Sequence, residues 1–323
     1  MNVAHVFAHV FINARSGAGD KDDLRDRIAR AFAAHGWQSE FISLDGNAMA
    51  AQIDAGIAAA RGVIVVCGGD GTINAVAAGC AKAGRPLGII AGGTFNYVAR
   101  NIGLPVEGAT LVDEAVAVIV RGTTRPHDGG FVNDRLFLNN AGFGLYSRII
   151  SERETDKRRF GRSRVVAFLS GLRFLFRAHP LLKVELVADG EARRLKTTTL
   201  FFGCNAAQLA NWNVAAAQCL ADHKLAVLSM RIDSRIDIAR AMLSAAFGKL
   251  EAAENIDALC AAEVVVRTRR AHLSVAIDGE IVRFAPPLAV RLARDALSVY
   301  ADPLQPERAC RPPLFSSPRP SRR

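Results

Sequence analysis

The sequence lacks several patterns that would place it in a common class. None of its 6 cysteines forms a Cys-x-x-Cys pair, and none of its 7 histidines has the His-Glu-x-x-His spacing of a zinc site. No apolar run reaches the roughly 18 to 20 residues that cross a bilayer. The first nine residues carry no basic stretch with a small-residue cleavage site. We therefore expect a cytoplasmic protein with reduced thiols that is neither secreted nor transmembrane.

The composition is that of a globular protein with a basic surface. The chain has 323 residues, half of them hydrophobic, and a formal net charge of +10. Such a charge favours an anionic partner but does not choose between nucleic acid, an acidic membrane and a phosphorylated ligand. Nucleic acid ranks last, because part of the charge lies in the C-terminal tail and no basic strand is interleaved with aromatic residues.

The first part of the chain alternates β-branched runs with alanine-rich helical runs. This alternation predicts an α/β fold, a doubly wound and mostly parallel sheet with helices on both faces. Ligands of such sheets bind at the carboxyl ends of the strands, where glycine-bearing turns follow three of the predicted strands. The strand and helix runs are 6–13, 20–35, 37–44, 47–60, 62–67, 72–83, 87–91, 94–102 and 110–121.

The second part reads as short strands separated by turn residues, which predicts an antiparallel β domain. Two helical patterns, at 163–178 and 235–251, interrupt it. The last segment is rich in Pro, Arg and Ser and should be disordered. We expect domains at 1–126 and 127–301, with a tail at 302–323. The predicted strands are 131–133, 135–140, 182–188, 197–203, 225–232, 263–268, 272–277 and 281–284.

The turn after the third predicted strand has the composition of a phosphate site. Its glycines let backbone N–H groups approach an anion, and the helix that follows points its positive end at the same place. Asp70 would lie beside the phosphates, which implies Mg²⁺ between the charges. The alternative is a plain turn in which Asp70 caps the helix. The candidate residues are Gly68, Gly69, Asp70, Gly71, Thr72 and Asn74.

A second turn of the same design follows the next predicted strand. It contains Gly93, Thr94 and Asn96, and Thr94 could cap a helix while offering its hydroxyl to a phosphate oxygen. Two such turns side by side suit a triphosphate and predict an ATP-dependent kinase. A weaker third turn contributes Asn13, Ser16 and Gly17, for which an ordinary loop is an equal alternative.

Together these motifs resemble the diacylglycerol kinase catalytic-domain family, which includes bacterial lipid kinases and sphingosine kinases. That family shares its Gly-Gly-Asp-Gly turn with NAD kinases and phosphofructokinases, so the specific signal is the combination of motifs. The resemblance implies a nucleotide site on the α/β domain, a β-sandwich second domain, and a cleft between them where ATP phosphorylates a lipid hydroxyl. The motifs lie at 13–17, 68–72, 93–96, 99–100, 139–144 and 278–280.

The resemblance assigns the general base to Glu280, the last residue of Asp-Gly-Glu. From the residues alone, Asp278-Gly279 between two apolar runs first predicts a hairpin turn. A carboxylate at Glu280 could accept the proton of the alcohol as the γ-phosphoryl group leaves ATP. A surface glutamate is the alternative.

Two positions depart from the family pattern. Tyr97 stands where an aspartate often follows Gly-Thr-x-Asn, and it cannot hold a metal or accept the proton of the substrate. Bacterial relatives often carry an Asp-Asp-Gly turn with a structural cation, whereas here Asp222 is followed by His223. If a cation binds, the carbonyls of Cys219 and Lys224 would join Asp222. The alternative is a loop aspartate in a turn.

The partners that this interpretation implies are a nucleotide and a lipid at the membrane surface. A charged run at 151–164 precedes an apolar run at 165–176, and the pair could rest on the anionic inner surface of a membrane, although a solvated face over a packed helix is the preferred reading. The test is liposome binding after joint replacement of Lys157, Arg158 and Arg159 by Ala.

Two other functions remain open. An NAD kinase would share the glycine turn and usually has an Asn-Glu or Asn-Asp pair downstream. Asn133-Asp134 resembles that pair, but it lies in a predicted hairpin turn. A catalytically degenerate protein that binds nucleotide or lipid is the second alternative, with Tyr97 as the substitution that suggests it. Labelled ATP offered with NAD or with a lipid panel separates the three.

Overall fold

The computed structural model describes residues 6–13, 21–46, 48–160, 181–211, 218–230 and 256–302. The predicted helices at 163–178 and 235–251 and the tail from residue 303 onward lie outside this part of the chain, as do the side chains of Lys157, Arg158 and Arg159. No helix among the described residues is long and apolar enough to cross a membrane.

The N-terminal part is built on four parallel strands in the order β2-β1-β3-β4. Ile53 of α2 and Val76 of α3 pack on one face of the sheet, and Ile28 of α1 and Val116 of α5 pack on the other. The predicted doubly wound α/β fold is therefore confirmed. The elements are β1 (Phe7–Asn13), α1 (Lys21–Ala33), β2 (Gln38–Leu44), α2 (Met49–Ala59), β3 (Val63–Gly68), α3 (Asp70–Ala83), β4 (Leu87–Ala91), α4 (Tyr97–Asn101) and α5 (Leu111–Val120).

The C-terminal part is a sandwich of antiparallel strands, as predicted. One sheet has the order β12-β11-β10-β7-β14-β15, and its apolar face packs against strands β8 and β13 of the other sheet. Phe143 and Phe202 from the first sheet meet Leu186 and Val264 from the second in one buried core. The elements are β7 (Asn140–Gly144), α6 (Leu145–Phe160), β8 (Leu182–Ala188), β9 (Glu191–Thr197), β10 (Thr199–Gly203), α8 (Ala206–Asn211), α9 (Gln218–Ala221), β11 (Leu225–Met230), β12 (Ile256–Ala261), β13 (Glu263–Arg267), β14 (Leu273–Ile277) and β15 (Glu280–Phe284).

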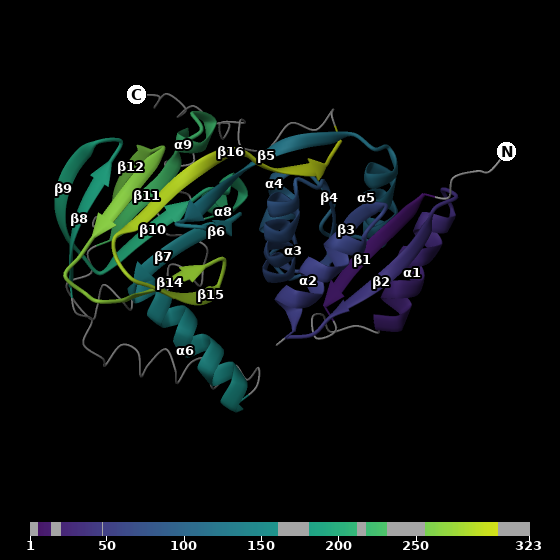
Figure 1. Ribbon diagram of the computed structural model, residues 1–323, viewed down its shortest axis with the longest axis horizontal. Coiled ribbons are helices and arrows are strands. Elements are labelled where there is room, and N and C mark those ends of the chain that lie inside the picture. The colour runs from purple at the N-terminus through teal and green to yellow at the C-terminus, as the bar shows by residue number, and fades with distance from the viewer. Residues whose placement is uncertain are drawn as a thin grey trace, which may run out of the picture.

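One long strand, β16 (Leu288–Tyr300), joins the two parts (Figure 1). Its start pairs with β13 in the sandwich, and its end pairs with β4 through Val299 and Leu87. Strand β5 (Thr124–Val132) pairs along it, and β6 (Arg135–Phe137) pairs with β5. A single ten-stranded sheet therefore runs through the described part of both halves. The expected domain boundaries at 126 and 301 stay a prediction, and β5 crosses the first.

The prediction of one strand over residues 135–140 is wrong. β6 ends at Phe137, and β7 begins at Asn140 in the other sheet. The chain crosses between the sheets because the N–H groups of Leu138, Asn139 and Asn140 turn away from a strand partner toward the carboxylate of Asp278. The spacing of apolar residues gives no sign of hydrogen bonds to a distant carboxylate such as Asp278.

The prediction that all thiols are reduced is also wrong. Cys219 and Cys260 form a disulfide between α9 and β12. The two residues lie 41 positions apart, and only the antiparallel pairing of β11 with β12 brings them together. Cys67, Cys80 and Cys204 are buried thiols.

Candidate functional site

The two predicted glycine turns lie against each other at the carboxyl ends of β3 and β4. The N–H of Gly92 donates to the carbonyl of Gly68 at 2.8 Å. A Cβ added to Gly93 would lie 2.5 Å from the Cα of Gly69, a distance that real Cβ atoms essentially never show. The close approach of the two backbones therefore requires glycine at these positions.

The space in front of the first turn is open. A Cβ added to Gly71, in the first turn of α3, would meet no atom within 4 Å. Space is therefore open beside Gly71 at the N-terminus of α3, the end of a helix that attracts anions. Asn13 at the end of β1 reaches the same place, since its Nδ2 donates to Oγ1 of Thr72 at 3.3 Å. Ser16 and Gly17 lie outside the described residues.

Asp70 connects the two turns. Its Oδ1 accepts the N–H of Val98 at 3.1 Å, so the carboxylate caps α4 rather than its own helix, whose N-cap is Gly69. Burial raises the pKa of Asp70, and hydrogen bonds from the N–H groups around the start of α4 oppose that rise. The carboxylate is therefore held rigidly at the positive end of α4.

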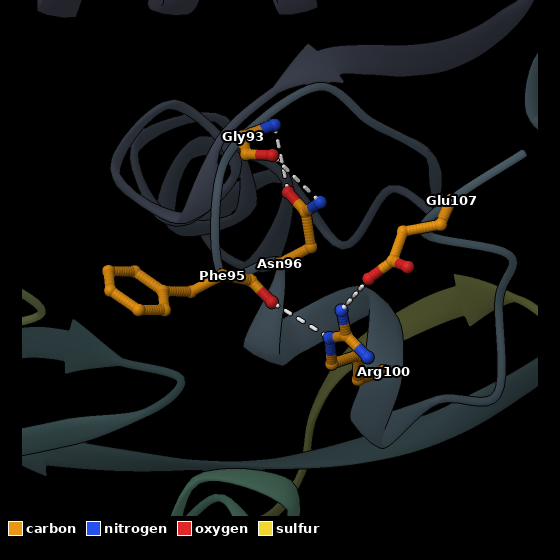
Figure 2. Close-up of polar contacts among 5 residues, drawn as sticks. All are labelled: Gly93, Phe95, Asn96, Arg100 and Glu107. Carbon is orange, nitrogen blue, oxygen red and sulfur yellow. Dashed lines mark hydrogen bonds and ion pairs between the residues drawn. The ribbon is translucent and has the colours of Figure 1, made fainter. Parts of the chain in front are cut away.

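The second turn is closed by Asn96, not by Thr94. Asn96 is left-handed, with φ 52°, and its amide exchanges two hydrogen bonds with the backbone of Gly93 at 2.8 and 3.0 Å (Figure 2). The predicted helix start at Thr94 is wrong because the chain first makes this turn, which asparagine tolerates, and α4 begins only at Tyr97. The exposed Thr94 keeps its hydroxyl available to a ligand.

The Asp-Gly-Glu segment forms the predicted hairpin between β14 and β15. Asp278 and Gly279 have φ angles of 45° and 91°, and Ile277 pairs with Glu280 across the turn. The carboxylate of Asp278 accepts the N–H groups of Leu138, Asn139 and Asn140 at 2.7, 3.0 and 2.8 Å. Glu280 is the exposed first residue of β15.

Packing between elements links the two acids. Asp70 caps α4, α4 packs against α8, and Gln208 of α8 bonds Asn140, whose N–H donates to Asp278. The pKa of Asp278 is raised to about 7, chiefly by burial and slightly by the charge of Asp70, against the lowering effect of the three N–H donors. Asp70 belongs to the α/β part and Asp278 to the sandwich. That the glycine turns and the Asp-Gly-Glu hairpin form one site, as the family resemblance implies, stays a prediction.

Residues 7–132 match the family model described as "Diacylglycerol kinase catalytic domain". Over this segment the chain is similar to the diacylglycerol kinase catalytic domain family, as the motifs predicted. Glycine turns, Asp70 and α4 all lie inside the matched segment, whereas the Asp-Gly-Glu hairpin lies beyond it.

Individual relatives agree with this assignment. The chain is 35% identical to the diacylglycerol kinase of Bacillus subtilis (strain 168) over 131 residues, which is 40% of this chain and 42% of that protein. It is 39% identical to the diacylglycerol kinase of Staphylococcus saprophyticus over 92 residues, 28% of this chain and 29% of that one. These matches span less than half the length of the curated relatives.

The fold agrees over almost the whole chain. A diacylglycerol kinase structure from Bacillus anthracis str. Sterne superposes with a TM-score of 0.64 at 19% sequence identity, covering 92% of this chain and 97% of that one. At this identity the likeness shows the fold, an α/β part followed by an antiparallel sandwich.

A buried amide network, which the sequence did not predict, adjoins the anchor of Asp278. Asn140 donates to Gln208 at 2.9 Å and accepts from the hydroxyl of Tyr146 at 2.8 Å, and Asn205 donates to Asn139 at 2.8 Å. Burial raises the pKa of Tyr146, to which Asp278 and Tyr97 also contribute. The signal in the sequence was the consecutive Asn139-Asn140 pair, whose polar side chains need partners when buried.

The loop expected to bind a structural cation is organised differently. His223 adopts the left-handed conformation, φ 52°, that a glycine would favour, and its Nδ1 lies 2.6 Å from the carboxylate of Asp128 on β5. The carbonyl of Cys219 accepts the N–H groups of Asp222 and Lys224. Within the described ranges no three His, Cys, Asp or Glu side chains gather as metal ligands. This arrangement does not favour the cation, which stays a prediction.

Proposed function

We propose that this protein is a lipid kinase that transfers the γ-phosphate of ATP to the hydroxyl of a diacylglycerol or a related lipid. The observation that carries the proposal is the packing of the two glycine turns on each other, with Asp70 of the first turn bonded to the helix that follows the second. The family whose model matches residues 7–132 implies the use of ATP. The lipid acceptor is inferred from the names of the relatives and from the basic net charge.

The glycine turns suit the phosphates of ATP. Backbone N–H groups at 68–72 and 93–96, together with the hydroxyls of Thr72 and Thr94, would bind the phosphate oxygens, and the open volume before Gly71 has room for them. Asn13 and Asn74 would support this cradle from β1 and α3. Asp70 fits a divalent cation because an acid beside a polyphosphate is otherwise repulsive, and Mg²⁺ would supply charge neutralisation there.

Glu280 would take the proton from the alcohol. In the transfer, the O–H bond of the acceptor breaks and its proton goes to the Glu280 carboxylate, while the acceptor oxygen bonds to the γ-phosphorus. The bond between that phosphorus and the bridging oxygen breaks, and its electron pair leaves with ADP. The exposed position of Glu280 at the start of β15 leaves its carboxylate accessible to a substrate. Most of the rate would come from positioning and electrostatics.

Transfer of labelled γ-phosphate to extracted membrane lipids tests the proposal. We expect Asp70→Ala to lower kcat/KM by roughly 100- to 1000-fold, about 3 to 4 kcal/mol, and Glu280→Ala to lower it by about 10- to 100-fold. Asp70→Asn keeps an oxygen for the Val98 N–H but loses the charge, so it should also lose activity while α4 stays capped.

Asp113→Ala, which removes an exposed acid from α5, is the matched control and should keep full activity. Full activity of the Asp70 variants would refute the mechanism. Nucleotide binding without transfer in the wild type would instead indicate a degenerate, regulatory protein.

The NAD kinase alternative gains no support from the structure. Asn133 and Asp134 form the turn between β5 and β6, and the amide and backbone of Asn133 bond the backbone of Ala289 at 2.9 and 2.7 Å. Asn133 is therefore engaged in holding β5 to the start of β16. Phosphorylation of NAD in the same assay would overturn the lipid kinase proposal.

A further inference from the structure

Two stacked aromatic rings flank Asn96 of the second glycine turn. Phe95 and Tyr97 stack with their centroids 5.4 Å apart and their planes 2° from parallel. The left-handed residue Asn96 lies between them in the chain. Phe95 is 51% exposed, and its ring points away from the polar contacts of Asn96 and Arg100 (Figure 2). The exposed ring offers apolar surface to a ligand, because burial of such a ring is worth about 1.5 to 3 kcal/mol.

Other exposed apolar side chains lie on the elements that border the same site. Ile149 is 37% exposed on α6, one turn after Tyr146, and Ile281 is 39% exposed directly after Glu280. Helix α6 packs beside β14 and β15. Exposed apolar groups thus flank the hairpin that carries Asp278 and Glu280, which suits a ligand that is part alkyl chain and part polar group.

The hydroxyl of Tyr97 is available to such a ligand. Among the described residues it has no hydrogen-bond partner, although it lies close enough to the Tyr146 hydroxyl to influence its ionisation. Tyr97 directly precedes Val98, whose N–H donates to Asp70, and its helix α4 packs against α8. Gln208 of α8 in turn bonds Asn140, whose N–H donates to Asp278. A neutral phenol can donate one hydrogen bond there without adding a further negative charge.

We propose that the Tyr97 hydroxyl donates a hydrogen bond to the oxygen of the acceptor alcohol, while the stacked Phe95 ring lies against the adjoining alkyl chain. This inference rests on the proposed lipid kinase function and deepens it. Tyr97 then positions the acceptor without receiving its proton, which goes to Glu280. It also gives Tyr97 a role of its own, distinct from that of the aspartate for which it substitutes.

The experiment compares two variants that separate the hydroxyl from the ring stack. Tyr97→Phe keeps the stack and removes the hydroxyl. We expect the KM for dispersed short-chain diacylglycerol to rise about 10-fold and the KM for ATP to stay unchanged. A 10-fold change corresponds to the loss of one hydrogen bond worth roughly 1.4 kcal/mol. Phe95→Ala should raise the KM for long-chain diacylglycerol more than the KM for short-chain diacylglycerol. Tyr300→Phe and Phe7→Ala are the matched controls, on β16 and β1.

Binding of short-chain diacylglycerol in the absence of ATP, measured by calorimetry, keeps the inference separable from the proposed function. A wild-type protein that binds diacylglycerol without phosphorylating any lipid sinks the proposed function. Equal affinity of the wild type and Tyr97→Phe for diacylglycerol, whether or not the wild type phosphorylates a lipid, overturns the role of Tyr97. A rise in the KM for ATP alone in Phe95→Ala would place the adenine ring, not the alkyl chain, on the stack and would overturn the inference as well.

Discussion

Two carboxylates, Asp70 and Asp278, anchor backbone that belongs to other elements. Asp70 caps α4, and Asp278 holds the N–H groups at the crossing from β6 to β7. Each acid therefore shapes the loop that lies opposite it, and each has its pKa raised by burial. The candidate site owes its geometry to these anchors as much as to the residues proposed to touch ligands.

The raised pKa of Asp278 predicts that stability falls as pH rises from about 4 to about 7. In that window the folded state keeps a proton that the unfolded chain releases, so ionisation costs the folded state up to about 4 kcal/mol for a shift from 3.8 to about 7. Urea unfolding of the wild type and Asp278→Asn at pH 4, 5, 6, 7 and 8 measures this pH dependence of the free energy of unfolding.

In Asp278→Asn this component of the pH dependence should vanish. The two free energies of unfolding should therefore differ by a pH-dependent amount, with the wild type losing stability toward pH 8. Parallel curves for the two proteins would show that Asp278 titrates normally. Asp134→Asn, which changes an acid in the turn between β5 and β6, is the control.

At the scale of elements, the two strand-to-helix turns are packed on each other rather than merely adjacent. Gly69 and Gly93 touch through their backbones, whereas Gly71 faces open space. The glycines of one motif therefore serve two purposes. Those at 69 and 93 allow contact between turns, and the one at 71 leaves room for a ligand.

This difference predicts opposite results for two alanine substitutions. Gly93→Ala should lower the free energy of unfolding by about 1 to 3 kcal/mol, because its Cβ would meet the Cα of Gly69. Gly71→Ala should leave stability unchanged or raise it by about 0.5 to 1 kcal/mol, since it lies in helix α3, and yet weaken ATP binding about 10-fold.

Thermal unfolding and ATP titration of the two variants provide the measurements. Unaltered ATP affinity in Gly71→Ala would mean that the open volume is not the phosphate site. Unaltered stability in Gly93→Ala would mean that the turns separate readily.

At the scale of the whole molecule, β16 makes the two halves one structure. Leu297 and Val299 are buried in the core of the α/β part, and Leu288 and Val290 in the core of the sandwich. Two halves that share a sheet cannot separate freely, so we expect the relative placement of Asp70 and Asp278 to vary little.

Continuity of the sheet predicts that damage to one core loosens both. Leu297→Ala, at a side chain 2% exposed, should cost about 2 to 5 kcal/mol and speed amide hydrogen exchange in β3 and in β11 alike. Leu181→Ala, at a 39% exposed position, should leave both unchanged. Faster exchange confined to β3 would show that the halves unfold independently.

Features that depend on neighbouring residues were predictable from the sequence, and features that depend on distant contacts were not. Hydrophobic periodicity located the parallel strands and most helices, and Asp278-Gly279 correctly predicted its hairpin, because these features depend on neighbouring residues. β16 was missed because its 13 residues follow no strict alternation and serve two different cores. The Cys219–Cys260 disulfide was missed because strand pairing, not spacing, brings the two residues together.

By itself the sequence determined the α/β-then-sandwich order, the family resemblance and the residues of the candidate site, since glycine turns and acid motifs are local in the chain. Only the tertiary structure decided that Asp70 caps α4, that Asp278 holds the β6–β7 crossing and that Phe95 stacks on Tyr97. The reason is physical. A buried carboxylate binds whichever N–H groups the fold brings to it, and their place in the sequence carries no sign of that partner.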